Sequence, residues 1–395
     1  MAAPGNPTDL TRNAVDVLPA GRLDEQLASG RPLRVKLGID PTTPDIHLGH
    51  TVVLEKLREF QVAGHRVVLI VGDFTARVGD PSGRSIQRPL PSPEDIEANA
   101  ATYQEQAFKV LDRERTEVRF NSEWLRMAPE ELLGLLAQTT VARLIERDDF
   151  QKRLAAGAPI AALELLYPLL QGYDSVAVEA DVEIGGTDQK FNLLFGRDIQ
   201  TAYGQQPQSI LTLPILVGTD GERKMSKSLG NYVGVSEAPE EMFGKTMRVP
   251  DEAMADYYRL VLGVEPPAGP PNEAKRALAR GIVERFHDRA AATGAERHFD
   301  RLFVERRAPD EVEELDLGPF VAGNGDVVHL PRLMAEAFDI SSSEARRLIG
   351  QGGAKLDGEP IPSDMLDFDP ADLDGRVLQA GKRRFRRLRA VPGSH

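Results

Sequence analysis

Two histidines near the start of the chain have the residue type and spacing to handle a phosphorylated ligand. His47, Gly49 and His50 stand in the string HLGH, where we expect a helix to begin just beyond a strand. Backbone N–H groups and the helix dipole favour phosphate at such a position, and a glycine lets a flat base lie against the backbone. The string indicates an ATP site, although an isolated HxxH pair is more often one packed and one solvated histidine.

A second string of chemical interest, KMSKS, follows some way along the chain. It contains Lys224, Ser226, Lys227 and Ser228 and has glycines on both sides, so we expect a movable loop. Two lysines on flexible stems can reach a triphosphate and meet the charge that builds up on a leaving pyrophosphate, and the serines add hydrogen bonds. Alone, the string could be an ordinary solvated basic loop; together with HLGH it predicts a nucleotide site.

The elements that must position these strings are a strand, a helix and a second strand. The stretch 34–41 alternates and then becomes apolar, which predicts a short strand, and residues 47–64 repeat apolar positions at helical spacing. We expect Asp45 or Thr43 to cap this helix. The aliphatic run 67–71 is typical of a parallel strand covered on both faces. The pattern predicts the first crossover of a doubly wound, Rossmann-like α/β domain.

A largely helical insert should divide this domain. Residues 94–146 are predicted to be mostly helical, and the second group of strands is expected near 176–184 and 210–217. One apolar stripe is expected along the insert. Its members are Leu132, Leu133, Leu136, Leu144 and Ile145.

Beyond residue 229 the composition predicts a different architecture. Helical segments are interrupted by the proline-rich stretch 264–271, and an acidic, glycine-containing linker spans roughly 308–326. The tail then predicts a small α+β fold: Ser341 as N-cap with Glu344 in a capping box, followed by a short basic helix. A hairpin should turn at Asp357-Gly358, and VLQAGKRRFRRLR should form one last strand with basic side chains.

Composition excludes several classes of protein. With 61 acidic and 48 basic residues the net charge is −13, so a polyanion must bind to local basic patches. The chain has no cysteine, which excludes disulfides, thiolate metal sites and cysteine nucleophiles. We expect no membrane span, no export signal, no DNA partner and a cytoplasmic protein.

Five separate strings, in order, carry a resemblance to a known family. They are KLGIDPTTPDIHLGH, VGDFTARVGDPSGRS, YPLLQGYDS, EIGGTDQKFN and KMSKS, and the tail resembles an S4 RNA-binding domain. HxGH at the first crossover with KMSKS after the last core strand is the signature of the class I aminoacyl-tRNA synthetases. Nearly the whole chain resembles the bacterial tyrosyl-tRNA synthetases. A dehydrogenase is excluded, because no glycines have the GxGxxG spacing.

The resemblance implies three domains and a two-step reaction. A catalytic domain would span 1–228 with its insert at about 95–170, a helical anticodon-binding domain and linker 229–325, and an S4-like domain 326–395. The enzyme would join tyrosine to ATP and then transfer tyrosyl to the 3′ end of tRNA(Tyr). Magnesium would accompany ATP; we assign no metal ligands and no prosthetic group. A homodimer with the insert at its interface is implied, although a monomer whose stripes face its own core explains the apolar helices as well.

The resemblance also assigns residues of this sequence to the site. Asp174 would accept the phenolic hydroxyl of tyrosine, and a buried acceptor left unpaired would reject phenylalanine. The substrate ammonium would lie among Asp80, Thr75, Tyr167 and Gln171. Tyr167, Gln171 and Asp174 are spaced by four and three residues, hence on one helix face. Adenosine and the amino acid would contact Gly38, Asp40, Gly186, Asp188 and Gln189, and the triphosphate Thr42, His47, Gly49, His50, Lys224, Ser226, Lys227, Ser228, Arg84 and Arg88.

Some of these assignments have simpler readings or depart from the family. Asp80 could be only a turn residue before Pro81, and Asp188 a helix N-cap. Lys36 stands where many tyrosyl enzymes have a tyrosine that shares the phenol with the aspartate. A lysine there can pair with Asp174 or donate to the phenol oxygen.

Basic residues of the tail form the patch that the acidic net charge requires for RNA. Phosphate contacts of this kind supply affinity with little sequence information. A solvated surface strand is the alternative. Two rival functions stay open: a tryptophanyl-tRNA synthetase, and a catalytically silent RNA-binding relative. The expected tRNA-binding residues are Arg346, Arg347, Lys382, Arg383, Arg384, Arg386 and Arg387.

Overall fold

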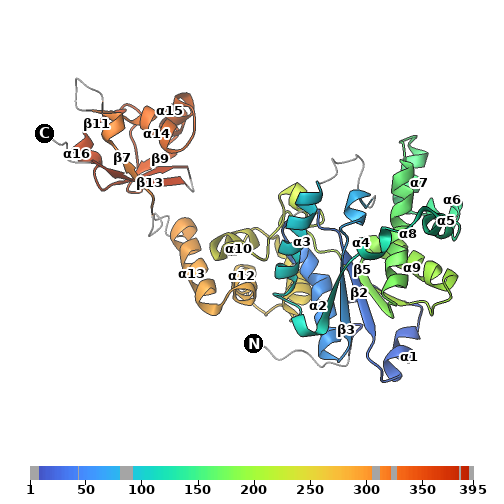
Figure 1. Cartoon of the computed structure of the whole chain (residues 1–395). Helices are drawn as coiled ribbons and strands as arrows, with labels where there is room; N and C mark the ends of the chain where they lie inside the picture. The colour runs from blue at the N-terminus through green and yellow to red at the C-terminus, as the bar shows by residue number, and fades with distance from the viewer. Residues whose placement is uncertain are drawn as a thin grey trace. The chain divides into compact units, whose positions relative to one another are not determined.

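The computed structural model describes residues 9–42, 44–80, 92–304, 312–321, 327–381 and 384–390. The chain divides into two compact units, Met1–Asp288 and Arg289–His395 (Figure 1). The division into three domains at 228/229 and 325/326 stays a prediction.

A six-stranded sheet forms the centre of the first unit. Its strand order is β1-β6-β5-β2-β3-β4, and every neighbouring pair is parallel except β1 with β6. Helices cover both faces, with α2 and α3 on one side and α8 and α9 on the other (Figure 1). The doubly wound α/β fold is confirmed. The strands are β1 Asp16–Leu18, β2 Arg34–Ile39, β3 Arg66–Val71, β4 Thr116–Phe120, β5 Val182–Gly186 and β6 Ser209–Leu213, and the helices are α1 Arg22–Ala28, α2 Leu48–Val62, α3 Pro93–Ala107, α8 Ala162–Ala177 and α9 Lys190–Ala202.

The predicted strand, helix and strand correspond to β2, α2 and β3, but two other expectations were wrong and one strand was not foreseen. Residues 94–146 are mostly helical as expected, but strand β4 lies within them. Helix α8 extends to Ala177, so β5 begins six residues later than the expected 176. His47, and not Asp45 or Thr43, is the N-cap of α2, because its own ring accepts from the backbone; Thr43 lies outside the described residues.

The insert between β4 and α8 consists of short helices, and its apolar residues do not form one continuous stripe. Both α5 and α6 contact α8. The single-stripe prediction was wrong, since Leu133 is 65% exposed whereas Leu135, which the stripe left out, is fully buried. The chain breaks between α5 and α6 near Thr140, whose side chain caps α6. The two halves of the predicted stripe therefore lie on different helices. The insert helices are α4 Ser122–Leu125, α5 Pro129–Leu136, α6 Val141–Leu144 and α7 Asp148–Ala155.

Helices complete the first unit after residue 229, as the composition predicts. Helix α10, Pro239–Thr246, packs against α12, Pro271–Phe286. Between them lie α11, Met254–Tyr257, and a π-helical turn, Tyr258–Leu262, that contacts α2. The proline-rich stretch 264–271 leads directly into α12, whose first residue is a proline.

The second unit contains a five-stranded sheet in the order β10-β9-β12-β13-β7 and a two-stranded sheet of β8 and β11. Ser341 caps α15 as predicted, with its side chain accepting from the Glu344 N–H, but only this half of the expected capping box is formed. Asp357 and Gly358, both at positive φ, form the expected hairpin turn between β9 and β10. The elements are α13 Arg289–Phe299, β7 Glu314–Asp316, β8 Val328–His329, α14 Leu330–Ala337, α15 Ser342–Gly350, β9 Ala354–Leu356, β10 Glu359–Pro360, β11 Asp367–Phe368, α16 Pro370–Leu373, β12 Val377–Ala380 and β13 Arg384–Arg389.

Two expectations about this unit were wrong. The stretch VLQAGKRRFRRLR forms a hairpin of β12 and β13, because Gly381 at positive φ ends the first of them. The region 308–326, expected to be a linker, contains β7, which pairs in parallel with β13.

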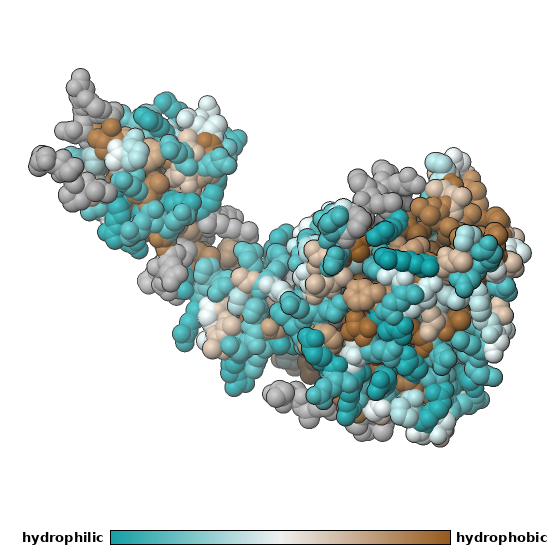
Figure 2. Space-filling model, in the orientation of Figure 1, coloured by the Kyte–Doolittle hydropathy of each residue, from teal (hydrophilic) through white to brown (hydrophobic). Residues whose placement is uncertain are grey.

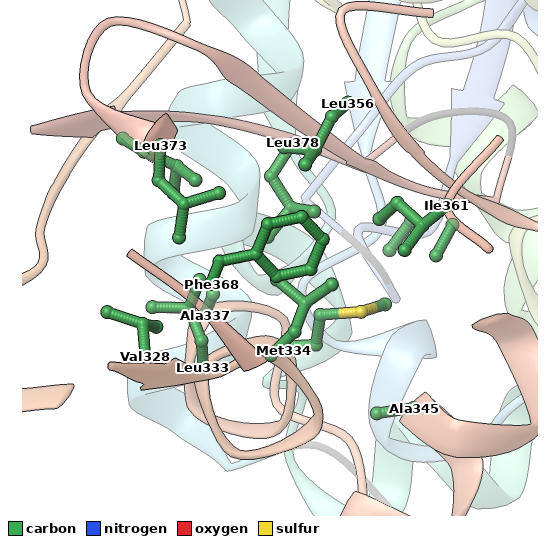
Figure 3. Close-up of a cluster of buried hydrophobic side chains, with 14 of the residues drawn as sticks. Val328, Leu333, Met334, Ala337, Ala345, Leu356, Ile361, Phe368, Leu373 and Leu378 are labelled. Atoms are coloured by element: carbon green, nitrogen blue, oxygen red, sulfur yellow. The ribbon is translucent and has the colours of Figure 1, made fainter. Parts of the chain in front are cut away.

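The second unit has a hydrophobic core of its own. Phe368 lies at the centre of a cluster that includes Leu333, Met334, Leu356 and Leu378 (Figure 3). Buried side chains from α14, α15 and the five-stranded sheet meet there. Such a core allows this unit to hold its shape by itself.

No helix within the described ranges is long and apolar enough to cross a membrane.

Candidate active site

The candidate site lies where the order of the sheet changes direction. From β2 the chain proceeds outward to β3 and β4, and then returns to β5 and β6 on the other side. Ligands of open α/β sheets bind outside the carboxyl ends of the strands at such a point. Two adjoining cavities of about 300 and about 380 Å³ are found there, and they share Asp40, Thr42, His50, Asp80 and Asp188 among their lining residues. We call the first the amino-acid cavity and the second the nucleotide cavity.

The two histidines of HLGH lie together at the start of α2. Their rings are stacked with centroids 3.9 Å apart. His47 Nδ1 accepts from the Gly49 N–H, and His50 Nδ1 accepts from the His47 N–H, each at 3.2 Å. Burial, and then the charge of neighbouring groups, lowers the pKa of His47 to about 2 and that of His50 to about 4. Both rings are therefore neutral at pH 7, and each must carry its proton on Nε2, as a hydrogen-bond donor.

Gly49 lies directly under this pair of rings. A Cβ atom at this position would come within 3.0 Å of His47 Cε1 and Nδ1. Any larger residue would therefore press against the His47 ring and require it to shift. The glycine thus allows the close packing of this histidine.

The KMSKS loop forms the opposite wall of the nucleotide cavity. All five of its residues line the cavity, together with His47 and His50. Gly230, at φ 66°, follows its short 3₁₀ turn, and the Ser226 N–H donates to Asn231 Oδ1 at 2.8 Å. The structure thus brings both strings to one cavity although some 180 residues separate them.

Both lysines of the loop are paired with carboxylates. Lys224 Nζ lies 3.4 Å from Asp188 Oδ2, and Lys227 forms an ion pair with Asp45. All four side chains are one-third to one-half exposed. Pairs this exposed are worth only about 0.2–1 kcal/mol, so an anionic ligand can replace them.

The amino-acid cavity contains an acceptor network around Asp40. Tyr167 donates its hydroxyl to Asp40 Oδ2 at 2.9 Å, and Thr75 donates to Asp40 Oδ1 at 2.7 Å. Burial and the nearby Asp40 raise the pKa of Tyr167, which keeps the phenol protonated as a donor. A Cβ at position 72 would lie 2.0 Å from Asp40 Oδ1, so only Gly72 admits the carboxylate here.

Asp174 forms the closed end of the amino-acid cavity on α8. The side chain is 3% exposed. It accepts from Trp124 Nε1 at 2.8 Å and from Asn121 Nδ2 at 3.4 Å. Burial raises its pKa to about 7, against the lowering effect of nearby Lys36 and these two donors. Neither donor was predicted. Trp124 is the only tryptophan in the chain, and its single indole N–H, which needs an acceptor when buried, could have marked it as a candidate.

Lys36 does not take the place that was expected for it. Its Nζ atom lies 2.9 Å from Glu183 Oε1 and donates to Ser175 Oγ at 2.7 Å and to the Gln171 carbonyl at 3.2 Å. An ammonium group has three N–H donors, so these three acceptors use all of them. Lys36 is absent from the lining of the amino-acid cavity, and the expected pairing with Asp174 or a phenol oxygen is replaced by a pair with Glu183.

Asp80 connects the amino-acid cavity to the insert. Gln189 Nε2 donates to Asp80 Oδ2 at 2.8 Å, and the guanidinium of Arg147, whose side chain is 4% exposed, lies 3.6 Å from Asp80 Oδ1. Arg147 was not predicted, because nothing in its local sequence marks it as buried. Asp188 is no helix N-cap: it lies within the short turn Thr187–Gln189 that precedes α9.

The predicted site residues therefore separate into three groups. Those lining the amino-acid cavity are Gly38, Asp40, Thr42, His50, Thr75, Asp80, Tyr167, Gln171, Asp174, Gly186, Asp188 and Gln189. Those lining the nucleotide cavity besides the shared ones are His47, Gly49, Lys224, Ser226, Lys227 and Ser228. Lys36 lies behind the cavities, and Arg84 and Arg88 fall outside the described residues.

The basic residues of the second unit have partly structural roles. Arg346 and Arg347 are exposed on α15. On β13, Arg384 donates to the Phe338 carbonyl and Arg387 to the Gly375 carbonyl, while Arg386 pairs with Glu313 at 3.1 Å. These contacts fix the direction of the arginines. Lys382 and Arg383 lie outside the described residues.

Comparison with known proteins gives consistent findings over nearly the whole chain. A family model described as tRNA synthetases class I (W and Y) matches residues 28–304. The tyrosine–tRNA ligase of Moorella thermoacetica is 51% identical, over 96% of this chain and 94% of that protein. The tyrosine–tRNA ligase of Geobacter sulfurreducens is 49% identical, over 96% and 97%.

Solved structures share the fold at lower sequence identity. The tyrosyl-tRNA synthetase of Archaeoglobus fulgidus, complexed with L-tyrosine, has a TM-score of 0.60 and 22% identity, covering 72% of this chain and 97% of that chain. The tyrosyl-tRNA synthetase of Aeropyrum pernix has a TM-score of 0.60 and 22% identity, covering 74% and 96%. These two likenesses bear on the fold alone.

Proposed function

The chain belongs to the class I tRNA synthetase family, among the tyrosine–tRNA ligases, and from the geometry of its two cavities we propose how its residues do the chemistry. The amino-acid cavity binds tyrosine, the nucleotide cavity binds ATP, and the reaction occurs where the two meet. The convergence of HLGH and KMSKS on one cavity that adjoins the Asp174 cavity carries this proposal.

Adenylate formation needs no protein nucleophile in this site. The carboxylate of tyrosine is ionised at pH 7, so its oxygen attacks the α-phosphorus directly, the bond to the bridging oxygen breaks and pyrophosphate leaves. Negative charge grows on the departing phosphates, where the neutral histidines donate from Nε2 and the two lysines supply positive charge. Lys224 and Lys227 must leave Asp188 and Asp45 to do so. Because the charge on pyrophosphate grows as it departs, the contacts of the lysines are strongest in the transition state.

Recognition of tyrosine rests on buried polar groups. Asp174, held by Trp124 and Asn121, accepts the phenolic hydroxyl, and Asp80, Thr75, Tyr167 and Gln171 surround the ammonium group. A buried carboxylate that loses its donor is strongly disfavoured, so phenylalanine is rejected without an editing step.

Magnesium enters this proposal only with ATP. Over the described ranges of the chain, no group of three or more His, Asp or Glu side chains could hold a metal ion. No step of the mechanism is therefore assigned to a metal that the protein itself binds. The charge on the triphosphate is met by the lysines of KMSKS.

A pyrophosphate-exchange assay across the amino acids tests the proposed activity. Exchange stimulated by tyrosine alone is the expected result. Exchange with tryptophan and not tyrosine would make the chain a tryptophanyl enzyme. No exchange with any amino acid would favour a silent RNA-binding relative.

The second unit is proposed to bind tRNA(Tyr). Exposed Arg346 and Arg347 lie on a short helix beside a sheet that carries further arginines. Phosphate contacts by such residues are salt-dependent. Replacing both with glutamine should raise the KM for tRNA while leaving pyrophosphate exchange unchanged; an unchanged KM would remove this helix from the RNA surface.

A homodimer in the cytoplasm is also proposed. Apolar surface gathers over α5 to α8 in Figure 2, and Leu133, Val141, Leu154 and Leu163 there are 44–65% exposed. An apolar patch on a soluble enzyme usually marks an interface. Sedimentation should give a dimer that Leu133→Asp with Val141→Asp dissociates; a wild-type monomer would contradict it.

A further inference from the structure

A buried polar cluster adjoins the amino-acid cavity, between α8 and the strands β2 and β5. Its centre is the ion pair of Lys36 and Glu183, whose side chains are 0% and 1% exposed. Ser175 accepts from Lys36 and donates to Glu183, and Gln208 donates to Glu183 from the far side. The reaction described above uses neither charge, so the cluster needs another explanation.

Gln171 and Glu183 are the members of this cluster that also line the amino-acid cavity, and Gln171 carries the side chain of interest. Its main-chain carbonyl accepts from Lys36, and its side-chain Nε2 donates to Glu183 Oε1 at 3.3 Å. Its Oε1 atom is buried and has no hydrogen-bond partner among the described residues. Gln171 also lines the amino-acid cavity. A buried acceptor without a donor is unfavourable, which is expected of a group that awaits a ligand.

The two charges together determine which end of the amide can face the cavity. A lysine alone would attract the amide oxygen, whereas a carboxylate accepts from the amide nitrogen and leaves the oxygen free. The glutamate alone would be an uncompensated buried charge, and Lys36 neutralises it. Lys36 therefore allows the Glu183 carboxylate to be buried, and this carboxylate fixes the orientation of the Gln171 amide.

We propose that the Lys36–Glu183 pair is a positioning device that fixes the Gln171 side chain so that Oε1 accepts a hydrogen bond from the ammonium group of the substrate. Lys36 thus acts on the ammonium end of the cavity through Gln171 and does not itself bind the phenol. This inference rests on the proposed binding of tyrosine in this cavity.

The test compares two ligands that differ only in the amino group. They are tyrosine and 3-(4-hydroxyphenyl)propanoate, which keeps the phenol and the carboxylate. The variant Lys36→Met with Glu183→Gln removes both charges and leaves no free one behind. We expect the KM for tyrosine in pyrophosphate exchange to rise roughly tenfold, as for one lost hydrogen bond to a charged group, while the Ki of the propanoate changes less than about twofold.

A matched control removes a second lysine–glutamate pair from the same unit. Lys56 and Glu59 form an ion pair on α2, with Lys56 buried, and neither residue lines the amino-acid cavity or the nucleotide cavity. Lys56→Met with Glu59→Gln should leave the ratio of the two constants unchanged. Should the first variant fail to fold, Glu183→Asp keeps the charge, lengthens the contact to Gln171, and should raise the KM for tyrosine alone by a few-fold.

Three outcomes would overturn the inference. Equal weakening of both ligands would make the pair a general support of the fold. Loss of discrimination between tyrosine and phenylalanine would place Lys36 at the phenol end. Unchanged binding of both would leave the pair without a positioning role. An inactive wild-type chain would instead count against the proposed function.

Discussion

The two cavities of the site hold their charged groups in opposite ways. Around the amino-acid cavity Asp174 is 3% exposed and Lys36 is completely buried, and protein donors or acceptors fix both. In the nucleotide cavity the side chains of Lys224 and Lys227 are 49% and 33% exposed and pair with equally accessible carboxylates. The first arrangement suits discrimination in the ground state, whereas the second lets charges move when pyrophosphate departs.

The largest effect should come from the movable charges. Lys227→Ala is expected to slow adenylate formation roughly 100-fold, as for the loss of one transition-state donor. Its side chain lies outside the lining of the amino-acid cavity, so the dissociation constant for tyrosine should be nearly unchanged. Single-turnover kinetics and equilibrium binding measure the two quantities. An equal loss in the rate of adenylate formation and in the affinity for tyrosine would show that the two cavities do not have separate roles.

A smaller effect is expected at the fixed end of the site. Asp174→Asn keeps the shape but removes the charge that accepts the phenol, so kcat/KM for tyrosine should fall roughly 30-fold. The value for phenylalanine should fall much less, since that substrate has no hydroxyl to lose a contact. Pyrophosphate exchange with both amino acids gives the ratio. If the ratio of kcat/KM for tyrosine to that for phenylalanine stayed as in the wild type, Asp174 would not be the group that recognises the phenol.

The pH dependence of tyrosine activation should report the same carboxyl. The native pKa of Asp174 is raised from 3.8 to about 7, so the native chain holds a proton that the unfolded chain has lost between these values. This group therefore lowers stability as pH rises through that window. Tyrosine binding has the opposite sign, because the ionised form accepts the phenol better. We expect kcat/KM to fall below pH 7, and Asp174→Asn to flatten this limb.

The histidines should not contribute to that limb. Their pKa values are lowered to about 2 and about 4, so both stay neutral as pH falls from 7 to 5. The stability they supply as neutral groups is lost only as pH falls below 6.5 through these values. His50→Gln, which keeps one N–H donor, should cost roughly tenfold in adenylate formation and leave the limb near pH 7 in place. A limb that disappears in this variant would make the imidazole the titrating group.

The smallest effect should come from Asp45. Its ion pair with Lys227 is one-third exposed, and Asp45→Asn frees the lysine for ATP. We expect the KM for ATP to fall about twofold, within the range of an exposed ion pair. The KM for tyrosine should not move. A rise in the KM for ATP would show that Asp45 helps to hold the nucleotide.

Local sequence patterns predicted the elements that are determined by local interactions. The strand at 34–41 and the helix from 47 follow from hydrophobic periodicity, and the hairpin turn follows from Asp357-Gly358. Strand β4 was missed because its residues are all half-buried, and its sequence TEVRF gives no clear alternation. A strand like this is determined by pairing with β3, which no local pattern contains.

The candidate site shows the same difference between features that local sequence predicts and features that depend on distant residues. The convergence of HLGH and KMSKS could be predicted because their strings carry the chemistry. The partners of Lys36 could not be, because Glu183 lies some 150 residues away on β5 and the lysine's three acceptors come from two elements. Trp124, Asn121 and Arg147 contact the site carboxylates Asp174 and Asp80 from residues 121–147, whose short helices the apolar pattern did not resolve.

A crystal structure of the chain with ATP and tyrosinol, which lacks the attacking carboxylate, tests the central claim most directly. The account predicts one triphosphate that contacts the Nε2 atoms of His47 or His50 and the ammonium group of Lys227, with Asp45 released. A nucleotide bound to only one of the two strings, or Lys227 still paired with Asp45 beside it, would contradict the account.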